Sequence, residues 1–340
     1  MQPQTEAGRI GADPGQDERK SALDEWVSRQ ISQSLVGQSA SADASFRRYF
    51  RYKFPDCDGE HSLIAMDAPP PQEDCRPFVR IAGLFADAGV HVPHIIAQDL
   101  ARGFLLLPDM GTRTWLEVLN EGNADARFER AIDALIRIQR ISQANVLPVY
   151  DEALLRRELE LFPQWFLERH LGLTVDQALR RELDGIFDLL VARALRQGQV
   201  YVHRDYMPRN LMDSDPDPGI IDFQDAVYGP VSYDVTSLFK DAFISWPEER
   251  VLGWLEQYWR RARAAALPVP EVFDAFLHDC DLMGAQRHLK VIGIFARICH
   301  RDGKPKYLED VPRFVAYLRT VIARRDELAP LGAVLDRLGL

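Results

Sequence analysis

Two short polar segments near the middle of the chain carry the residues best suited to chemistry. The first is His203-Arg-Asp-Tyr-Met-Pro-Arg-Asn210, in which Asp205 and Asn210 are separated by five positions on a segment that contains a proline. The second is Ile220-Ile-Asp-Phe-Gln-Asp225, in which Asp222 directly follows two isoleucines. Each segment begins at or just after a short apolar stretch of strand type, so both sets of polar side chains are expected at strand ends.

This arrangement of Asp and Asn matches the needs of phosphoryl transfer. That reaction requires a positioned hydroxyl acceptor and cations that neutralise the phosphate oxygens, with little covalent help from the protein. Carboxylate and amide oxygens are suitable ligands for Mg²⁺. The Asp-x-x-x-x-Asn spacing followed by a strand-borne Asp matches the kinase signature, with Asp205 as the base and Asn210 and Asp222 as metal ligands. The alternative is an ordinary polar loop, because Asp and Asn are common in turns.

The surrounding elements are expected to bring these side chains together. Short strands are predicted at Val200–Val202, Leu211–Met212 and Ile220–Ile221, and a hairpin between the last two would place Asn210 beside Asp222. Helical periodicity dominates residues 112–197 and returns from about residue 231 to the end. Within the first helical region, Thr174-Val-Asp-Gln177 fits a capping box that opens a helix.

The preceding part of the chain has a different pattern. Residues 1–20 are polar and indicate a disordered tail, and a helix is predicted from Ser21. Aromatic and basic residues alternate in 44–54, which is typical of a half-buried strand. Further strands are expected at Ser62–Met66, Ile95–Ala97 and Phe104–Leu107, with a helix over 74–88. The predicted fold is α+β and bilobal, with a small β-rich N-lobe at 21–107 and a larger helical C-lobe at 108–340.

The composition describes an acidic globular chain. Lys and Arg total 41 against 51 Asp and Glu, which gives a formal net charge of −10. Such a chain is a poor default binder of nucleic acid or anionic membrane, and no apolar run reaches the roughly 18 residues that span a bilayer. Its four cysteines form no C-x-x-C pair and indicate reduced thiols. The first twenty residues lack the apolar segment of a secretion signal, so we expect a cytoplasmic protein, which we also expect to be a monomer.

Several motifs resemble known families. The 203–210 loop, Asp222 and Tyr228-Gly-Pro-Val-Ser-Tyr-Asp234 are similar to the aminoglycoside phosphotransferase and choline kinase-like superfamily, which shares the protein-kinase fold. A narrower resemblance is to the bacterial anomeric N-acetylmuramate/N-acetylglucosamine kinases of cell-wall recycling, and it covers most of residues 21–330. The strings that carry it are Ser41-Ala-Asp-Ala-Ser-Phe-Arg-Arg-Tyr-Phe50, Ala65-Met-Asp-Ala-Pro69, Ile221-Asp-Phe-Gln-Asp-Ala226 and Gln286-Arg-His-Leu-Lys-Val-Ile-Gly-Ile-Phe-Ala-Arg297.

The resemblance implies an ATP- and Mg²⁺-dependent sugar kinase. Its acceptor would be the C1 hydroxyl of an amino sugar, positioned by Asp205, and its product an α-1-phosphate. Asp234 and His203 are expected to be structural residues of the catalytic region. Asp225, three residues after Asp222, is expected in the same cleft, against a sugar hydroxyl or a second metal ion.

The nucleotide side departs from the general kinase pattern. The sequence has no G-x-G-x-x-G motif, and the lysine of the third strand is replaced by Met66 or Asp67. Arg47, Arg48 or Lys53 would then supply the charge, and the alternative for each is a solvated strand residue. The missing lysine also leaves open a non-catalytic nucleotide-binding pseudokinase adaptor. The candidates for nucleotide binding are Ser41, Ser45, Arg47, Arg48, Leu107 and Asp109.

A basic segment at 286–306 is the candidate acceptor pocket. At about 100° per residue, Arg287, Lys290 and Arg297 form a stripe beside an apolar face. N-acetylmuramate carries a carboxylate that a guanidinium can bind with two hydrogen bonds, so Arg287, His288 and Arg297 are the substrate-binding candidates. The alternatives are a solvated charged face and, for His288, a buried core histidine. An aminoglycoside, choline or homoserine phosphotransferase stays open, although a basic stripe disfavours a cationic acceptor.

Overall fold

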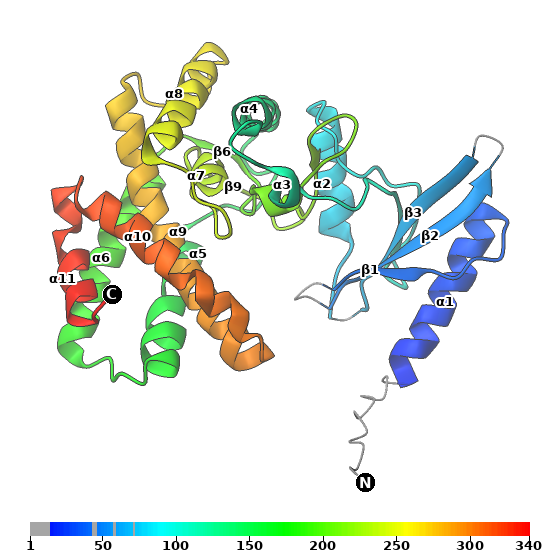
Figure 1. The fold of residues 1–340 in the computed structure, drawn as a ribbon, viewed down its shortest axis with the longest axis horizontal. Coiled ribbons are helices and arrows are strands. Elements are labelled where there is room, and N and C mark those ends of the chain that lie inside the picture. The colour runs from blue at the N-terminus through cyan, green and yellow to red at the C-terminus, as the bar shows by residue number, and fades with distance from the viewer. Residues whose placement is uncertain (1–13, 43–45, 57–58, 71) are drawn as a thin grey trace, which may run out of the picture. The chain divides into compact units, whose positions relative to one another are not determined.

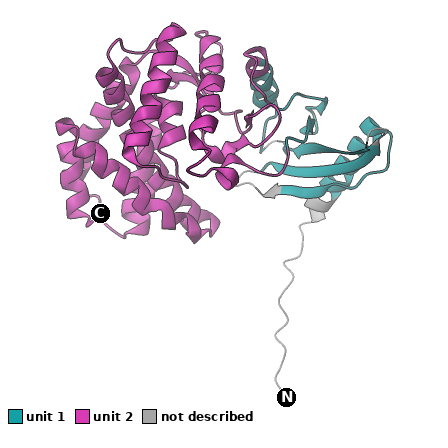
Figure 2. Cartoon of the chain, turned by 45° about the horizontal axis from the view of Figure 1, so that its top comes forward, with its two compact units in different colours: residues 1–83, 93–110 teal, residues 84–92, 111–340 magenta. Residues whose placement is uncertain are grey.

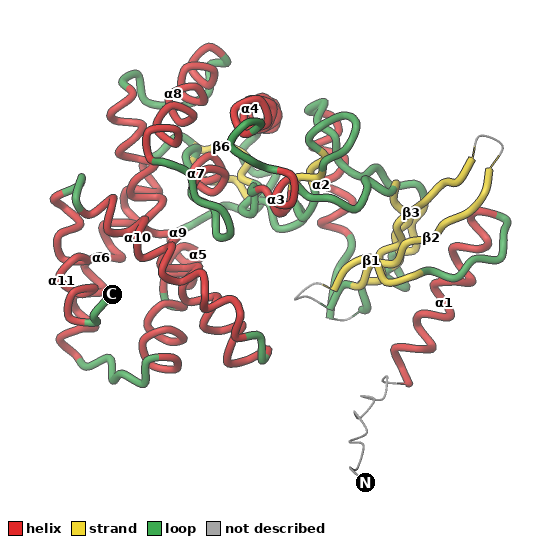
Figure 3. Tube along the Cα trace, viewed as in Figure 1, coloured by secondary structure: helices red, strands yellow, loops and turns green. Residues whose placement is uncertain are grey.

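The computed structural model describes residues 14–42, 46–56, 59–70 and 72–340, and the chain divides into two compact units (Figure 2). Unit 1 comprises Met1–Gly83 and Pro93–Met110, and unit 2 comprises Leu84–Val92 and Gly111–Leu340. Unit 1 is built around a sheet and unit 2 is mostly helical, so the predicted α+β class is confirmed (Figure 3). In the described part of the chain, no helix is long and apolar enough to cross a bilayer.

Unit 1 contains one antiparallel five-stranded sheet with the strand order β1-β2-β3-β5-β4. The long strands β2 and β3 form a hairpin in which Arg48 pairs with Asp67 and Asp56 with Gly59. The strands are β1 (Gln38–Ala42), β2 (Arg48–Asp56), β3 (Gly59–Asp67), β4 (Ala97–Asp99) and β5 (Phe104–Pro108). The β2, β3, β4 and β5 strands lie near their predicted positions, whereas the sequence did not predict β1.

Helix α1 (Pro14–Ile31) lies along this sheet (Figure 1). Its Leu23, Trp26 and Val27 are buried against strand residues that include Tyr52 and Phe104. The predicted start at Ser21 was therefore too late, and residues 14–20 of the expected tail belong to the helix. The remaining helix of this region, α2 (Arg76–Asp87), begins in unit 1 and ends in unit 2.

Unit 2 is organised around the 30-residue helix α9 (Phe273–Asp302). It packs against the π-helix η1 (Phe162–His170). The backbones approach closely at Gly293, where a Cβ atom would lie 2.3 Å from the carbonyl carbon of Leu161, so a glycine is required there. The other helices are α3 (Trp115–Val118), α4 (Ala124–Arg140), α5 (Glu152–Leu159), α6 (Gln177–Arg196), α7 (Tyr233–Phe239), α8 (Glu248–Ala264), α10 (Val311–Ile322) and α11 (Ala329–Arg337), with short 3-10 turns η2 (Pro208–Asn210), η3 (Pro305–Asp310) and η4 (Asp326–Leu328).

Helix α6 begins inside the motif predicted to cap it, but two residues later than expected. The carboxylate of Asp176 accepts hydrogen bonds from the backbone N–H groups of Ala178 (3.0 Å) and Leu179 (2.8 Å). Asp176 is therefore the N-cap, and the predicted capping role of Thr174 was wrong. An aspartate is as good a cap as threonine or better, so the composition of this segment allowed either choice.

Two small antiparallel sheets position the polar segments of unit 2. The first pairs β6 (Gln199–Val202) with β9 (Val227–Pro230), and the second pairs β7 (Leu211–Met212) with β8 (Gly219–Ile220). The β7–β8 hairpin is the one predicted from the sequence, and β9 was not predicted. The 203–210 loop leaves β6 and enters β7, so both of its ends are fixed by strands.

Candidate active site

The start of the 203–210 loop is fixed by a single buried carboxylate. Asp234, in the first turn of α7, accepts a hydrogen bond from the backbone N–H of His203 at 2.7 Å and from that of Arg204 at 3.0 Å. Burial raises the pKa of Asp234 to about 7, and the two N–H donors oppose this effect. Because Arg204 has a φ of 76°, a conformation unfavourable for a side chain of its size, these two bonds also hold a strained backbone. The geometry supports the structural role expected for Asp234.

His203 connects this loop to the segment that carries Asp222. Its ring is buried, with Nε2 3.0 Å from the carbonyl of Ile221 and Nδ1 3.3 Å from the backbone N–H of Asp205. Since that N–H donates to Nδ1, we assign the ring proton to Nε2. Burial lowers the pKa of His203 to about 4, so the ring is neutral at pH 7. These contacts support a structural role for His203.

The structure brings Asn210 and Asp222 together across the β7–β8 hairpin. The side-chain amide of Asn210 donates to the carbonyl of Asp205 at 2.9 Å and to Oδ2 of Asp222 at 3.4 Å. Oδ1 of Asp222 accepts a bond from Nε2 of Gln224 at 2.8 Å. Asp222 itself has a φ of 64°, which turns the chain sharply after β8. The hairpin therefore produces the proximity that the spacing of these residues predicted.

The donor atoms of this pair fit a magnesium ion. Because the amide nitrogen of Asn210 is occupied by Asp205, its Oδ1 is the atom that can accept a cation beside the Asp222 carboxylate. Among residues 14–42, 46–56, 59–70 and 72–340, no group of three or more His, Cys, Asp or Glu side chains could hold a metal. Few protein ligands are typical of Mg²⁺, which keeps waters and binds substrate phosphates.

Asp205 is positioned by hydrogen bonds of its backbone groups. Its N–H and C=O groups are bonded to His203 and Asn210, as described above. Within the described residues, no donor or cation is paired with the carboxylate itself. A half-buried carboxylate with free oxygens on a fixed loop can accept a proton from a hydroxyl group.

A buried ionic network supports the loop from behind. The carboxylate of Glu158, in α5, lies 2.5 Å from the Arg204 guanidinium and 2.9 Å from Nζ of Lys290, and it also accepts a bond from the Tyr150 hydroxyl. Burial alone would raise the pKa of Glu158, but the charges of Lys290 and Arg204 lower it to about 2. Lys290 also donates to the Tyr233 hydroxyl at 3.0 Å. The network thus ties α5 and α9 to the 203–210 loop.

The basic stripe predicted on α9 is not an exposed surface. Arg287 is only 2% exposed and donates to the carbonyl of Lys240 at 3.3 Å. His288 is fully buried against the rings of Phe314 and Tyr317, and burial lowers its pKa far below the usual range. His288 therefore has the surroundings of a core histidine, which was the alternative to substrate binding. The burial of Arg287 likewise favours a structural role over the predicted contact with substrate.

The two remaining acceptor candidates keep some access to solvent. Arg297 is half-buried, and burial, together with the charge of Arg301, lowers its pKa. Asp225 has an exposed side chain, while its carbonyl accepts a bond from Arg204 at 3.4 Å. Substrate contacts of Arg297 and Asp225 stay predictions.

On the nucleotide side, the candidate cations are neutralised by acids of unit 1. Nε of Arg47 is 3.2 Å from Glu73, and Nε of Arg48 is 3.1 Å from Oδ2 of Asp67. Lys53, at the exposed end of the β2–β3 hairpin, is 3.8 Å from Glu60. Nucleotide binding by Arg47, Arg48 or Lys53 stays a prediction.

The other nucleotide-binding candidates bond to neighbouring side chains, are buried, or lie outside the described residues. Asp109 accepts hydrogen bonds from Nε of Arg51 at 2.5 Å and from the Ser62 hydroxyl at 2.7 Å. Leu107 is a buried residue of β5 opposite Ile64. Ser45 lies outside the described residues, as does the side chain of Ser41.

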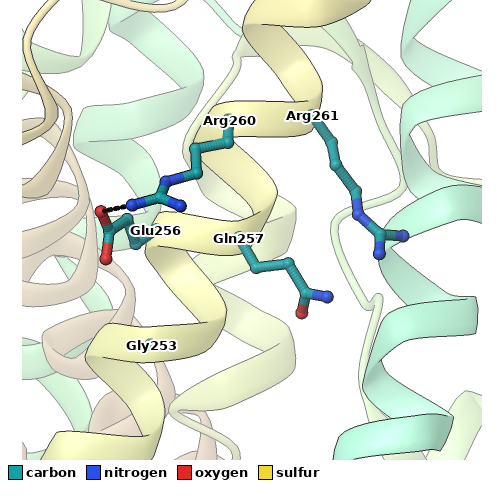
Figure 4. A pocket seen from close by; sticks show the side chains of 5 residues that line it. All are labelled: Gly253, Glu256, Gln257, Arg260 and Arg261. Atoms are coloured by element: carbon teal, nitrogen blue, oxygen red, sulfur yellow. Dashed lines mark hydrogen bonds and ion pairs between the residues drawn. The ribbon is translucent and has the colours of Figure 1, made fainter.

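One surface hollow lies away from all of these residues. It has a volume of about 230 Å³ and is lined by five residues of α8 (Figure 4), namely Gly253, Glu256, Gln257, Arg260 and Arg261. Arg260 and Glu256 form an ion pair across one helical turn. None of the predicted site residues lines this hollow, so it does not define the active site.

Comparison with known proteins shows the family of this chain. Residues 36–276 match the model of the phosphotransferase enzyme family. The chain belongs to this family. It is 63% identical over 299 residues to the N-acetylmuramate/N-acetylglucosamine kinase of Pseudomonas aeruginosa, covering 88% of this chain and 87% of that protein. It is 46% identical over 303 residues to the protein of the same name in Neisseria meningitidis, covering 88% and 89%.

Solved phosphotransferase structures share the fold. The choline kinase LicA from Streptococcus pneumoniae has a TM-score of 0.62 at 12% identity and covers 89% of this chain and 99% of its own. The gentamicin–APH(2")-IIa complex has a TM-score of 0.58 at 15% identity and covers 90% and 97%. The predicted protein-kinase-like class is therefore confirmed, and the family places the chain among phosphotransferases.

Two residues of this region were missed by reasoning from sequence. Glu158 lies in an ordinary amphipathic helix, and only its burial between two cations distinguishes it. Arg209 lies inside the recognised loop, next to Asn210, but no role was assigned to it. A charged residue that separates two catalytic candidates was a signal that could have directed attention there.

Proposed function

We propose that this phosphotransferase family member transfers the γ-phosphoryl group of ATP to the anomeric C1 hydroxyl of N-acetylmuramate or N-acetylglucosamine. The observation that carries the proposal is the carboxylate of Asp205, which has no partner among the described residues, next to the Asn210–Asp222 pair on a loop fixed by Asp234. The substrate class rests on relatives at 46–63% identity that carry the name of this kinase. Formation of an anomeric phosphate and use in peptidoglycan recycling are parts of the same proposal.

In the proposed reaction, Asp205 orients the C1 hydroxyl and accepts its proton. The hydroxyl oxygen forms a bond to the γ-phosphorus while the bond between that phosphorus and the β-phosphate oxygen breaks, which yields a sugar phosphate and ADP. The Asn210 amide holds the carbonyl of Asp205 at 2.9 Å, so the base is positioned before the substrate binds.

Asn210 and Asp222 would hold Mg²⁺ in this proposal. When bound, the ion would neutralise charge on the phosphate oxygens. ATP as the donor is supported by the fold, since the aminoglycoside phosphotransferase APH(2'')-Ib, which is similar at a TM-score of 0.54 and 16% identity, was solved with ADP bound. We place the reaction in the cytoplasm, the compartment that supplies ATP.

A substrate panel tests this proposal. Purified protein with ATP and Mg²⁺ would be offered N-acetylmuramate, N-acetylglucosamine, choline and kanamycin in a coupled assay of ADP release, and the products would be analysed by phosphorus NMR. We expect turnover with the amino sugars and the coupling pattern of an anomeric phosphate. Preferred turnover of choline or kanamycin would replace the substrate assignment, and phosphate on a ring hydroxyl would overturn the site of transfer. ATP binding without turnover on any of the four would support the adaptor alternative.

A further inference from the structure

One arginine of the 203–210 loop has no ion-pair partner in the part of the chain that the structure describes. Arg209 is exposed and lies in the 3-10 turn η2, four residues after Asp205 and next to Asn210. Across residues 14–42, 46–56, 59–70 and 72–340, no carboxylate forms an ion pair with it, whereas Arg204 of the same loop is paired with Glu158. Among the described residues, the loop thus carries one half-buried guanidinium paired with Glu158 and one exposed guanidinium without a carboxylate partner.

Neutral contacts hold the Arg209 side chain in place. Its Nη1 donates to the Tyr307 hydroxyl at 3.3 Å, and its guanidinium carbon lies 5.3 Å from the centroid of the Phe243 ring. Phe243 and Tyr307 are both half-buried, and both pack against Phe295 of α9, with ring centroids 6.3 Å and 5.3 Å away. A guanidinium has five N–H donors, so one bond and one aromatic face orient it and leave most donors for a ligand.

These surroundings suit an anionic group of a small molecule that also reaches Asp205. A guanidinium binds a carboxylate through two parallel hydrogen bonds, and its affinity is highest when its orientation is already fixed. The aromatic side chains beside it offer apolar surface of the kind that lines small-molecule sites. Lys290 and Arg287, which the sequence placed on the acceptor side, are buried and therefore less able than Arg209 to bind an anionic group of a substrate.

We propose that Arg209 binds the carboxylate of the acceptor sugar and makes the enzyme select an acidic amino sugar over a neutral one, with Phe243 and Tyr307 as positioning residues. This inference rests on the proposed function, because it names the substrate group that is recognised beside the base. It assigns to the catalytic loop itself the cation that the sequence had placed on α9.

The test compares Arg209→Gln with the native protein on three substrates: N-acetylmuramate, its methyl ester and N-acetylglucosamine. In the native protein, we expect esterification to lower kcat/KM about 10- to 100-fold, because a charge-assisted bidentate contact is lost. In Arg209→Gln, the acid and the ester should differ by less than about threefold, and most of the loss on the acid should appear in KM. Tyr307→Phe should lower the preference for the acid by a smaller factor.

The matched control is Arg260→Gln, which removes an exposed arginine of α8 that pairs with Glu256. Its preference for acid over ester should equal that of the native protein. If Arg209→Gln keeps the native preference, or if the native protein does not distinguish acid from ester, the inference is wrong while the proposed kinase activity stands. If the native protein phosphorylates none of the three sugars, both the proposed function and the inference are wrong. The ester arm uses the native protein, so it can overturn the inference even if Arg209→Gln fails to fold, and Tyr307→Phe then tests the contribution of the contacts around Arg209.

Discussion

The 203–210 loop of unit 2 and strand β2 of unit 1 differ in how their charged side chains are bonded. In the loop, the orienting hydrogen bonds go to the backbone of Asp205, and its carboxylate has no partner among the described residues. On β2, Arg48 and Arg51 are bonded to Asp67 and Asp109. The geometry of a motif can be predicted from its sequence when its contacts are between residues close along the chain. The role of a cation on a strand cannot, because it depends on an acidic residue distant in the sequence.

The comparison is tested most directly at the free carboxylate. Asp205→Asn keeps the shape of the side chain and the backbone bonds but removes the proton acceptor. We expect kcat to fall by about 10²- to 10⁴-fold, with the dissociation constant of ATP changed by less than about threefold. Steady-state kinetics and calorimetric titration would measure the two quantities. Near-native turnover would show that the free carboxylate is not the base.

The ionic support behind the loop should have a large effect on stability. Glu158→Gln leaves the buried charge of Lys290 and the half-buried charge of Arg204 without a carboxylate, so we expect the free energy of unfolding at pH 7 to fall by about 3 to 5 kcal/mol. Glu152→Gln, on the exposed side of the same helix, is the control and should cost less than about 1 kcal/mol. Denaturant unfolding would measure both variants.

The same variant has a predicted pH dependence. The pKa of Glu158 is lowered from 4.5 to about 2, so its contribution to stability is present above pH 4.5 and is lost as the pH falls toward 2. The difference in stability between native protein and Glu158→Gln should therefore be largest near neutral pH and shrink below pH 4.5. A difference that stays constant over that range would contradict the assigned cause.

The strand side of the comparison predicts a smaller effect. Arg48→Gln and Asp67→Asn both remove the charge pairing between these two residues, but only the first removes the cation. If Arg48 contributes charge to the nucleotide, as predicted, Arg48→Gln should raise the KM for ATP about tenfold, and Asp67→Asn should not. An equal rise in both variants would assign the pair to the fold of unit 1 instead.

The sequence predicted the parts of the site whose contacts are local. The loop, the β7–β8 hairpin and the proximity of Asn210 and Asp222 follow from a spacing of a few residues and from strands that were recognisable as short apolar runs. The roles of Asp205, Asn210 and Asp222 stay predictions. The larger elements followed the hydrophobic periodicity, apart from the start of α1 and the strands β1 and β9.

The burial of basic residues on α9 could not be derived from the sequence. Helical periodicity placed Arg287 and Lys290 on one stripe, but whether that stripe meets solvent or other elements depends on contacts with remote residues such as Glu158 and Lys240. The pairing of Asp67 with Arg19 and Arg48 is of the same kind, because these residues are 48 and 19 positions away. Partners at such distances along the chain leave no periodic signal.

The left-handed backbone of Asp222 restricts the evolution of this position. At a φ of 64°, Gly, Asn and Asp are the residues that the chain accommodates with least strain, and of these only Asp offers a negative charge. A lineage that abandons catalysis could therefore exchange Asp222 for Asn or Gly while keeping its fold, whereas most other replacements would strain the backbone. An inactive descendant of this protein is thus expected to show Asn or Gly at position 222, with His203 and Asp234 retained.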